Sequence, residues 1–215
     1  MNDTNLDFER HERLGFPEIV YGERKSSDQI EHIARLHGER GLNLLITRVE
    51  AEQVSALAGS GEYDPVARTF MRIVQPPPSC NGVVGVVSAG TSDAPVVRET
   101  VNTLRFLGCE IRSFEDAGVA GIHRLLRHRE QLQSCRVLVC VAGFEGALSS
   151  VVAGLFPQPI IAVPTSVGYG VAAGGQAALN AMLASCANGL AVMNIDNGCG
   201  AALAAYRIVR PENQP

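Results

Sequence analysis

The amino-acid sequence predicts an α/β fold in which a doubly wound parallel sheet follows a small α/β N-terminal domain. Beyond residue 81, short apolar runs alternate with segments of helical periodicity, which is typical of parallel strands covered by helices on both faces. Ahead of them, the three consecutive prolines Pro76–Pro78 can neither continue a helix nor pair within a sheet. We therefore predict an N-terminal domain over residues 1–75, a proline-rich linker over 76–81 and a larger domain over 82–215.

The N-terminal domain shows one clear helix signal. Residues 26–28 (SSD) form a capping sequence, and apolar residues then recur at helical spacing, so we predict a helix that ends near Arg40. A strand over 43–47 and a second helix near 51–58 are predicted to follow. The charged stretch 8–23 indicates no chemistry by itself.

The larger domain is predicted to contain five strands in the order 2-1-3-4-5. Their apolar runs lie at residues 83–87, 109–114, 137–141, 160–163 and 190–194. Helices are predicted near residues 94–107, 121–132, 146–155, 175–185 and 200–208. Sheets of this kind bind ligands beyond the carboxyl ends of their strands, so the segments that follow the strands are the first place to look for a site.

Composition excludes several classes of function. The 215 residues carry a net charge of −4, with no basic stripe, so we expect no nucleic-acid partner. The polar, acidic start is unlike a signal peptide, and no apolar run reaches membrane-spanning length. Six cysteines without Cys-x-x-Cys spacing indicate reduced thiols, and we expect a cytoplasmic protein.

The stretch 137–206 is almost free of charge. It contains two carboxylates, Glu145 and Asp196, and neither Lys nor Arg. So little charge is atypical of a solvated surface, and we expect this stretch to be buried, partly against other subunits of a homo-oligomer. Both carboxylates follow apolar strands, so each is a candidate for the ligand site.

The polar segment after the first predicted strand has two interpretations. Its hydroxyls, its glycine and the following helix start could receive a phosphate, or the segment could simply cap the helix. The residues concerned are Ser88, Gly90, Thr91, Ser92 and Asp93.

Four further residues have both structural and functional interpretations. Glu145 either favours a helix dipole or acts in the site. His123, near a helix start, is either an exposed helical residue or a ligand contact. Cys186 lies between a helix and the last strand, where a thiol is either inert or a nucleophile; Cys199 raises the same question.

Several motifs together resemble two related enzyme families. Residues 142–155 (AGFEGALSSVVAGL) and 159–170 (PIIAVPTSVGYG) resemble the core of aminoimidazole ribonucleotide carboxylases, but the histidine of that family falls on Ala147. A fuller resemblance, from about residue 8 to 210, is to pyridinium-3,5-biscarboxylic acid mononucleotide synthases, which begin synthesis of the nickel-pincer nucleotide cofactor. It rests on RLGFPE at 13–18, AGTSD at 89–93, GVAGIHRLL at 118–126, PTSVGYG at 164–170, SCA at 185–187 and NIDNG at 194–198. Cys199 and Ser149 depart from that pattern, where an aromatic residue and a proline are expected.

The resemblance implies a carboxylase–hydrolase domain over 82–215 acting on nicotinic acid adenine dinucleotide and carbon dioxide. It places the nucleophile on Cys186 and an acidic proton acceptor on Glu145, with Asp93 as a third catalytic residue. The implied substrate contacts are Ser88, Gly90, Thr91, Ser92, His123, Gly143, Thr165 and Ser166. Mg²⁺ held by the substrate phosphates is compatible with this chemistry, which needs neither biotin nor a redox cofactor.

The resemblance to the purine enzymes further implies an octamer. Two alternatives remain open: an aminoimidazole ribonucleotide carboxylase or mutase, and a non-catalytic nucleotide-binding regulatory module.

Overall fold

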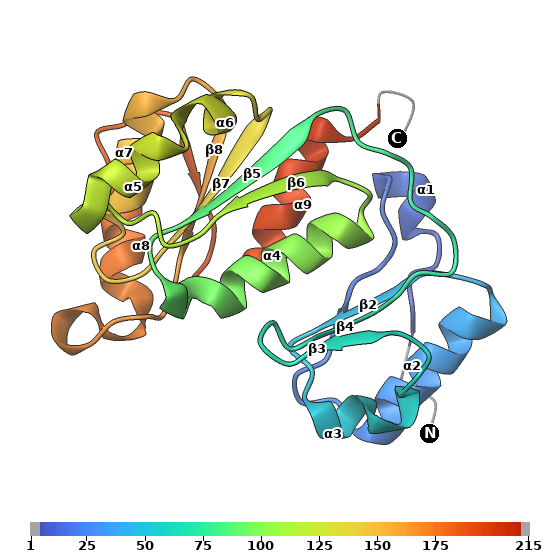
Figure 1. The fold of residues 1–215 in the computed structure, drawn as a ribbon. Coiled ribbons are helices and arrows are strands. Elements are labelled where there is room, and N and C mark those ends of the chain that lie inside the picture. The colour runs from blue at the N-terminus through green and yellow to red at the C-terminus, as the bar shows by residue number, and fades with distance from the viewer. Residues whose placement is uncertain (1–4, 212–215) are drawn as a thin grey trace.

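The computed structural model describes residues 5–211, which form two sheets with their helices (Figure 1). The larger sheet has five parallel strands in the order β6-β5-β7-β8-β9, which confirms the predicted order. These strands are β5 (Val83–Ser88), β6 (Glu110–Phe114), β7 (Val137–Ala142), β8 (Ile160–Pro164) and β9 (Leu190–Val192).

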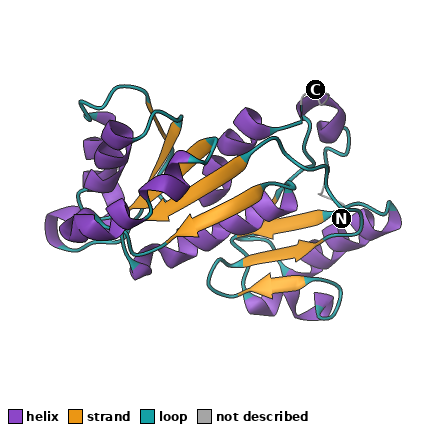
Figure 2. Ribbon diagram, turned by 45° about the horizontal axis from the view of Figure 1, so that its top comes forward, coloured by secondary structure: helices purple, strands orange, loops and turns teal. Residues whose placement is uncertain are grey.

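Helices cover both faces of the larger sheet (Figure 2), as predicted for a doubly wound fold. One face carries α4 (Ala94–Phe106) and α9 (Gly198–Val209), which pack against each other. The other face carries α5 (Ile122–Arg127), α6 (Arg129–Gln133), α7 (Ala147–Leu155) and α8 (Gln176–Leu183). Short 3-10 turns lie at Thr91–Asp93 (η2), Val119–Gly121 (η3) and Gly170–Gly175 (η4).

The strands of the larger sheet are apolar throughout because both faces are buried. On β7, Val139 packs in the core beneath α4 and α9, whereas its neighbour Cys140 packs in the core beneath α5–α8. Successive strand residues point to opposite faces, so a continuous apolar run is what a doubly covered strand requires.

The N-terminal domain forms the second sheet, in the order β1-β2-β4-β3. Its elements are α1 (Arg10–Leu14), β1 (Val20–Tyr21), α2 (Ser27–Glu39), β2 (Leu44–Thr47), α3 (Ala51–Val54), a 3-10 turn η1 (Ser55–Leu57), β3 (Glu62–Asp64) and β4 (Thr69–Arg72). The sequence predicted α2 and β2, and also a helix of which α3 and η1 form the counterpart. It did not predict α1, β1 or the β3–β4 hairpin.

Three local features account for differences from the predicted elements. The strands β1 and β3 have only two and three residues, too few to show an alternating pattern. The hairpin turn is instead set by Asp64, whose Oδ1 accepts hydrogen bonds from Val66 N and Ala67 N at 3.0 and 3.2 Å. The single helix predicted near 121–132 is divided into α5 and α6 at His128, whose φ and ψ are −97° and 8°.

The N-terminal sheet packs directly against α4 of the larger domain. Leu45 and Met71 belong to the same apolar core as Val97 and Leu104 of α4. Asn102 Nδ2, also on α4, donates to Thr69 Oγ1 at 2.9 Å and to Asp64 at 3.0 Å. These contacts hold the N-terminal domain beside the turns that follow the strands of the larger sheet.

Candidate functional site at the carboxyl edge of the parallel sheet

Four turns meet at the carboxyl edge of the larger sheet, and Asp93 connects three of them. Its Oδ1 accepts a hydrogen bond from Thr165 Oγ1, after β8, at 2.8 Å, and its Oδ2 accepts one from Gly90 N, after β5, at 2.9 Å. A third bond comes from Gly143 N, after β7. The fourth turn, at Asp196, is joined to the β8 turn, because Asp196 Oδ1 accepts from Ser166 N at 2.8 Å.

The environment of Asp93 assigns this carboxylate a positioning role. The residue is 3% exposed and its side chain points inward, toward the hydrogen-bond donors of the neighbouring turns. Burial raises the pKa of Asp93, while the hydrogen bonds from Thr165, Gly90 and Gly143 act in the opposite direction. Its charge therefore orders the turns that surround the site.

The hydroxyls of the β5 turn are divided between the core and the surface. Ser88 is 1% exposed and its Oγ has no hydrogen-bond partner among the described residues, so its contact with a phosphate stays a prediction. Thr91 and Ser92 are exposed on η2, just ahead of α4, and Gly90 is half-buried. An anion at this turn would meet Thr91, Ser92 and the start of a helix of 13 residues.

The β7 turn places Glu145 two residues from Gly143. A Cβ on Gly143 would overlap Val167 O and Thr165 Oγ1, so only glycine allows the β7 and β8 turns to approach this closely. Phe144 follows in the left-handed region, with φ of 53°. Glu145 itself is exposed in the single chain. Ala147, the first residue of α7, offers no imidazole for proton transfer.

Cys186 is the one exposed cysteine of the part of the chain that the structure describes. It lies on the segment from α8 to β9, where Ser185 Oγ is 2.7 Å from Ser150 Oγ on α7. No hydrogen bond within residues 5–211 joins this segment to Asp93 or Glu145. The segment leads into the first residue of β9, a strand parallel to β8, so Cys186 lies toward the edge of the sheet opposite the carboxyl-edge turns of its own chain.

The other cysteines are poorer candidates for a nucleophile. Burial raises the pKa of Cys135, of Cys140 and of Cys199, the last to about 12, so these thiols stay protonated near neutral pH. Cys80 and Cys109 lie ahead of β5 and β6, at the opposite edge of the sheet, with their Sγ atoms 3.1 Å apart.

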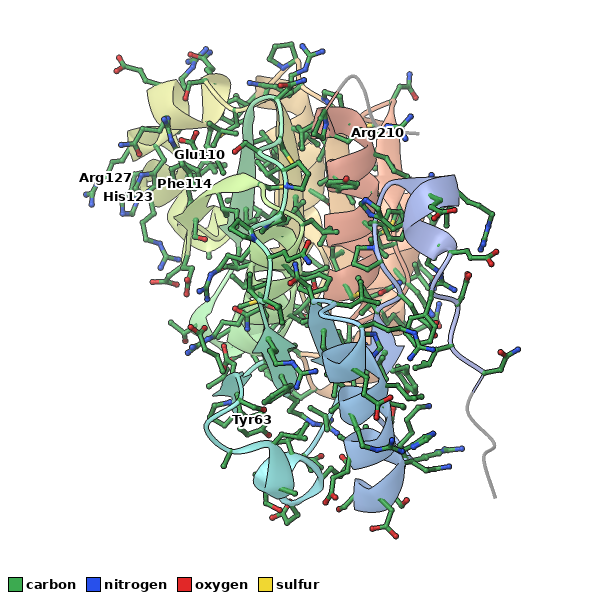
Figure 3. The ribbon with its side chains drawn as sticks, turned by 90° about the vertical axis from the view of Figure 1, so that its right-hand side faces the viewer. Tyr63, Glu110, Phe114, His123, Arg127 and Arg210 are labelled. Carbon is green, nitrogen blue, oxygen red and sulfur yellow. The ribbon has the colours of Figure 1, made fainter. Side chains whose placement is uncertain are left out.

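His123 lies outside this constellation in the single chain. It is exposed on α5, and Figure 3 shows its side chain beside that of Arg127. The loop ahead of α5 packs closely on the β5 turn, because a Cβ on Gly118 would come within 2.6 Å of Ala89 O. His123 thus shares the neighbourhood of the phosphate turn without pointing into it.

Two residues that the sequence did not indicate complete the arrangement. Arg48, after β2, donates from Nη2 to Asp196 O at 2.5 Å and lies 3.8 Å from Glu99 Oε1. Glu99, on α4, is 4% exposed and accepts from Cys199 N, at the start of α9, at 3.1 Å. Burial raises the pKa of Glu99, and Arg48 opposes this shift. The sequence could have indicated Glu99 as a buried carboxylate, because it lies at helical spacing among apolar residues. The sequence around Arg48 does not distinguish it from an ordinary surface arginine.

The described residues do not fit a metal held by the protein itself. Within residues 5–211, no three His, Cys, Asp or Glu side chains come together as a ligand set. Both oxygens of Asp93 already accept hydrogen bonds. We therefore derive no step through a metal. Nor does any helix in this part of the chain combine the length and apolar composition needed to cross a bilayer.

Comparisons with known proteins address the whole chain. Residues 1–75 match a LarB/PurE-like N-terminal domain, and residues 83–214 match AIR carboxylase. An uncharacterized protein of Methanocaldococcus jannaschii is 37% identical over 217 residues, covering 95% of this chain and 83% of that protein.

Two solved structures align with part of this chain. They are PurE of Treponema denticola, 23% identical, and a single-residue variant of PurE2 from the same organism, 22% identical. Each covers 59% of this chain and 78% of the other, with a TM-score of 0.47. From the two matched domains, we conclude that this carboxylase-type protein belongs to the AIR carboxylase family and is LarB-like, with a LarB/PurE-like domain ahead of the carboxylase domain.

Proposed function

We propose that the protein carboxylates the pyridinium ring of nicotinic acid adenine dinucleotide with carbon dioxide and hydrolyses the phosphoanhydride. The products are pyridinium-3,5-biscarboxylic acid mononucleotide and AMP. The observation that carries the proposal is the position of Glu145. Glu145 lies two residues after Gly143, whose N–H donates to the buried Asp93 carboxylate. The candidate proton acceptor therefore follows a turn that is hydrogen-bonded to the phosphate turn.

The carboxylation requires a nucleophile, because a pyridinium ring is too electron-poor to attack carbon dioxide. The Cys186 thiolate adds to ring carbon 4, which gives a neutral dihydropyridine that is nucleophilic at carbon 5. Carbon 5 then forms a bond to carbon dioxide. Glu145 removes the proton from carbon 5, and expulsion of the thiolate restores the aromatic ring. The ring electron pair that bonds carbon dioxide is replaced by the pair of the broken C5–H bond, and the C4–S pair leaves with the thiolate, so the sequence of steps involves no net oxidation.

The phosphate side of the substrate binds at Thr91 and Ser92. Both are exposed on η2, ahead of α4, where hydroxyl groups and the helix dipole favour an anion. Ser166, exposed in the β8 turn, is the third hydroxyl that faces solvent at this edge. Water attacks the phosphoanhydride, the P–O–P bond breaks, and AMP leaves.

The position of Cys186 leads us to propose a site completed by a second copy of the chain. Large apolar side chains are exposed around Glu145 and along α8: Phe144 is 42% exposed, Tyr169 78%, Val171 99% and Leu183 66%. The rings of Phe144 and Tyr169 contact each other edge to face at 5.5 Å. Such a patch in a charge-free stretch supports an interface between copies.

A homo-oligomer, with the octamer implied by the resemblance, would cover the patch and bring Cys186 of one copy to Glu145 of another. Light scattering tests this, and a stable monomer at micromolar concentration contradicts it.

The reaction itself is tested by product analysis. The protein is incubated with bicarbonate and nicotinic acid adenine dinucleotide, and in parallel with bicarbonate and aminoimidazole ribonucleotide. Mass spectrometry is expected to detect AMP and the dicarboxylated mononucleotide in the first mixture only, because Ala147 cannot supply the imidazole of the purine enzymes. Turnover of the imidazole nucleotide alone would overturn the proposal.

A further inference from the structure

A pocket of about 200 Å³ lies between the two domains and opens beside the phosphate turn. We call it the interdomain pocket. The larger domain contributes Ser92, Ser166, Glu99 and Asp196, and the N-terminal domain contributes Arg48 and Arg68. Two of these residues, Ser92 and Ser166, belong to the proposed substrate site, so the pocket extends that site toward the N-terminal domain.

The two arginines hold neighbouring positions on adjoining loops. Arg48 follows β2, Arg68 precedes β4, and Val49 N donates to Arg68 O at 2.9 Å. Both residues adopt the left-handed backbone region, each with φ of 52°. Of the six non-glycine residues with positive φ among the described residues, Asp116, Phe144 and Asp196 also lie at the carboxyl edge. Such conformations cost an L-residue energy and cluster at binding sites.

The carboxylates that line the interdomain pocket are engaged by other groups. Glu99 accepts from Cys199 N at 3.1 Å, and Asp196 Oδ1 accepts from Ser166 N at 2.8 Å. Glu99 Oε1 also lies 3.8 Å from Arg48 Nε, so Arg48 is already paired with a carboxylate. Among the described residues, Arg68 forms an ion pair with Glu50 and with neither carboxylate of the pocket.

Arg68 is the arginine with hydrogen-bonding capacity to spare. Its Nε is buried without a hydrogen-bond partner among the described residues, which is a costly state for a donor. Its Nη2 contacts Glu50 at 2.5 Å, but this ion pair is exposed, with side chains 41% and 54% accessible. Exposed ion pairs contribute little free energy, so a phosphate in the pocket can replace Glu50 as the partner of the Arg68 guanidinium.

We infer that the interdomain pocket binds the second phosphoryl group of a dinucleotide through Arg68. This inference rests on the proposed function, which supplies a substrate with two phosphoryl groups. One of them occupies the η2 turn at Thr91 and Ser92, and the other, which leaves with AMP, occupies the pocket. The N-terminal domain is then the half of the site that recognises the leaving nucleotide.

Calorimetric titration of the full-length protein tests this assignment with two probes, nicotinic acid adenine dinucleotide and nicotinic acid mononucleotide. Arg68→Gln is expected to weaken dinucleotide binding roughly ten- to hundredfold, which corresponds to the loss of a charge-assisted hydrogen bond. The mononucleotide, which has a single phosphate, should bind the variant as it binds the wild type.

Two matched variants separate phosphate binding from a structural role. Glu50→Gln removes the same ion pair as Arg68→Gln but keeps the guanidinium, so dinucleotide affinity should stay within about twofold of wild type or increase. Arg35→Gln removes an arginine from an exposed pair with Glu39 on α2, away from the pocket, and should leave both affinities unchanged. Equal losses in Glu50→Gln and Arg68→Gln would overturn the inference, as would equal losses for both probes in Arg68→Gln.

Failure of this inference can be told from failure of the proposed function. Carboxylated product from wild type, together with undiminished dinucleotide binding by Arg68→Gln, refutes the pocket assignment alone. Dinucleotide binding that depends on Arg68, without any carboxylated product, supports the pocket and refutes the reaction. A wild-type protein that binds neither probe refutes both.

Discussion

The bond between Thr165 and Asp93 gives a quantitative test of how the carboxyl-edge turns are held together. Thr165 is fully buried, and its Oγ1 donates to Asp93 Oδ1 at 2.8 Å. Thr165→Val keeps the branched shape and removes the donor. A hydrogen bond to a buried charged group contributes about 1.5–3 kcal/mol to the free energy of unfolding. For a protein of this size, the melting temperature should fall by roughly 3–12 °C.

The control for this variant is Thr165→Ser, which keeps the hydroxyl and loses one buried methyl group. That methyl group is worth about 1 kcal/mol, so the serine variant should be the more stable of the two. Denaturant unfolding of both variants, followed by circular dichroism, measures the difference. A valine variant at least as stable as the serine variant would refute the role assigned to this bond.

The same pair of variants predicts a pH dependence. Burial raises the pKa of Asp93, so the stability linked to its protonation is fully present below the unfolded pKa and is lost as pH rises through the folded pKa. Removing the Thr165 donor raises the pKa of Asp93 further and enlarges that loss. The difference in the free energy of unfolding between wild type and Thr165→Val should therefore be largest near neutral pH and should become smaller toward pH 4. A gap that stays constant with pH would show that the charge of Asp93 is not involved.

Three further outcomes are expected. Gly143→Ala should lower both stability and carboxylation, because the added Cβ overlaps Val167 O and Thr165 Oγ1; full activity at wild-type melting temperature would show that the two turns can separate freely. His37→Gln should reduce the acid-induced loss of stability below pH about 6.5. Burial lowers the pKa of His37, so the stability that it contributes is present above the unfolded pKa and lost as pH falls through the folded one; identical unfolding profiles would contradict this. Cys199→Ser should keep most activity in a turnover assay, because a thiol with a pKa of about 12 is not a nucleophile at neutral pH, and an inactive variant would move the chemistry to Cys199.

The larger domain was predictable because its strands and helices leave strong local signals. A parallel strand such as β7, buried on both faces, needs an uninterrupted apolar run, and that run is visible in the sequence. The hairpin of β3 and β4 was not predictable in this way. Its three- and four-residue strands are held by Asp64 and by contacts with Asn102, 38 residues away.

The site was predictable in its location but not in the direction of its side chains. The polar turns at Ser88–Asp93 and Glu145 do lie at one edge of the sheet, as parallel topology requires. Whether Asp93 points inward or outward depends on donors from Gly143 and Thr165, which local sequence does not encode. The contact of Arg48 with Asp196 spans 148 residues and joins two domains, so it becomes visible only in the folded chain.

The covalent role of Cys186 is tested most directly with ¹³C-labelled bicarbonate. Wild type and Cys186→Ser are incubated with labelled bicarbonate and nicotinic acid adenine dinucleotide, after calorimetry has shown that both bind the dinucleotide. Serine is nearly isosteric with cysteine but is a far poorer nucleophile near neutral pH. Wild type is expected to transfer the label to the dicarboxylated mononucleotide, and Cys186→Ser to do so several orders of magnitude more slowly. Labelling by Cys186→Ser at the wild-type rate would contradict the thiolate mechanism.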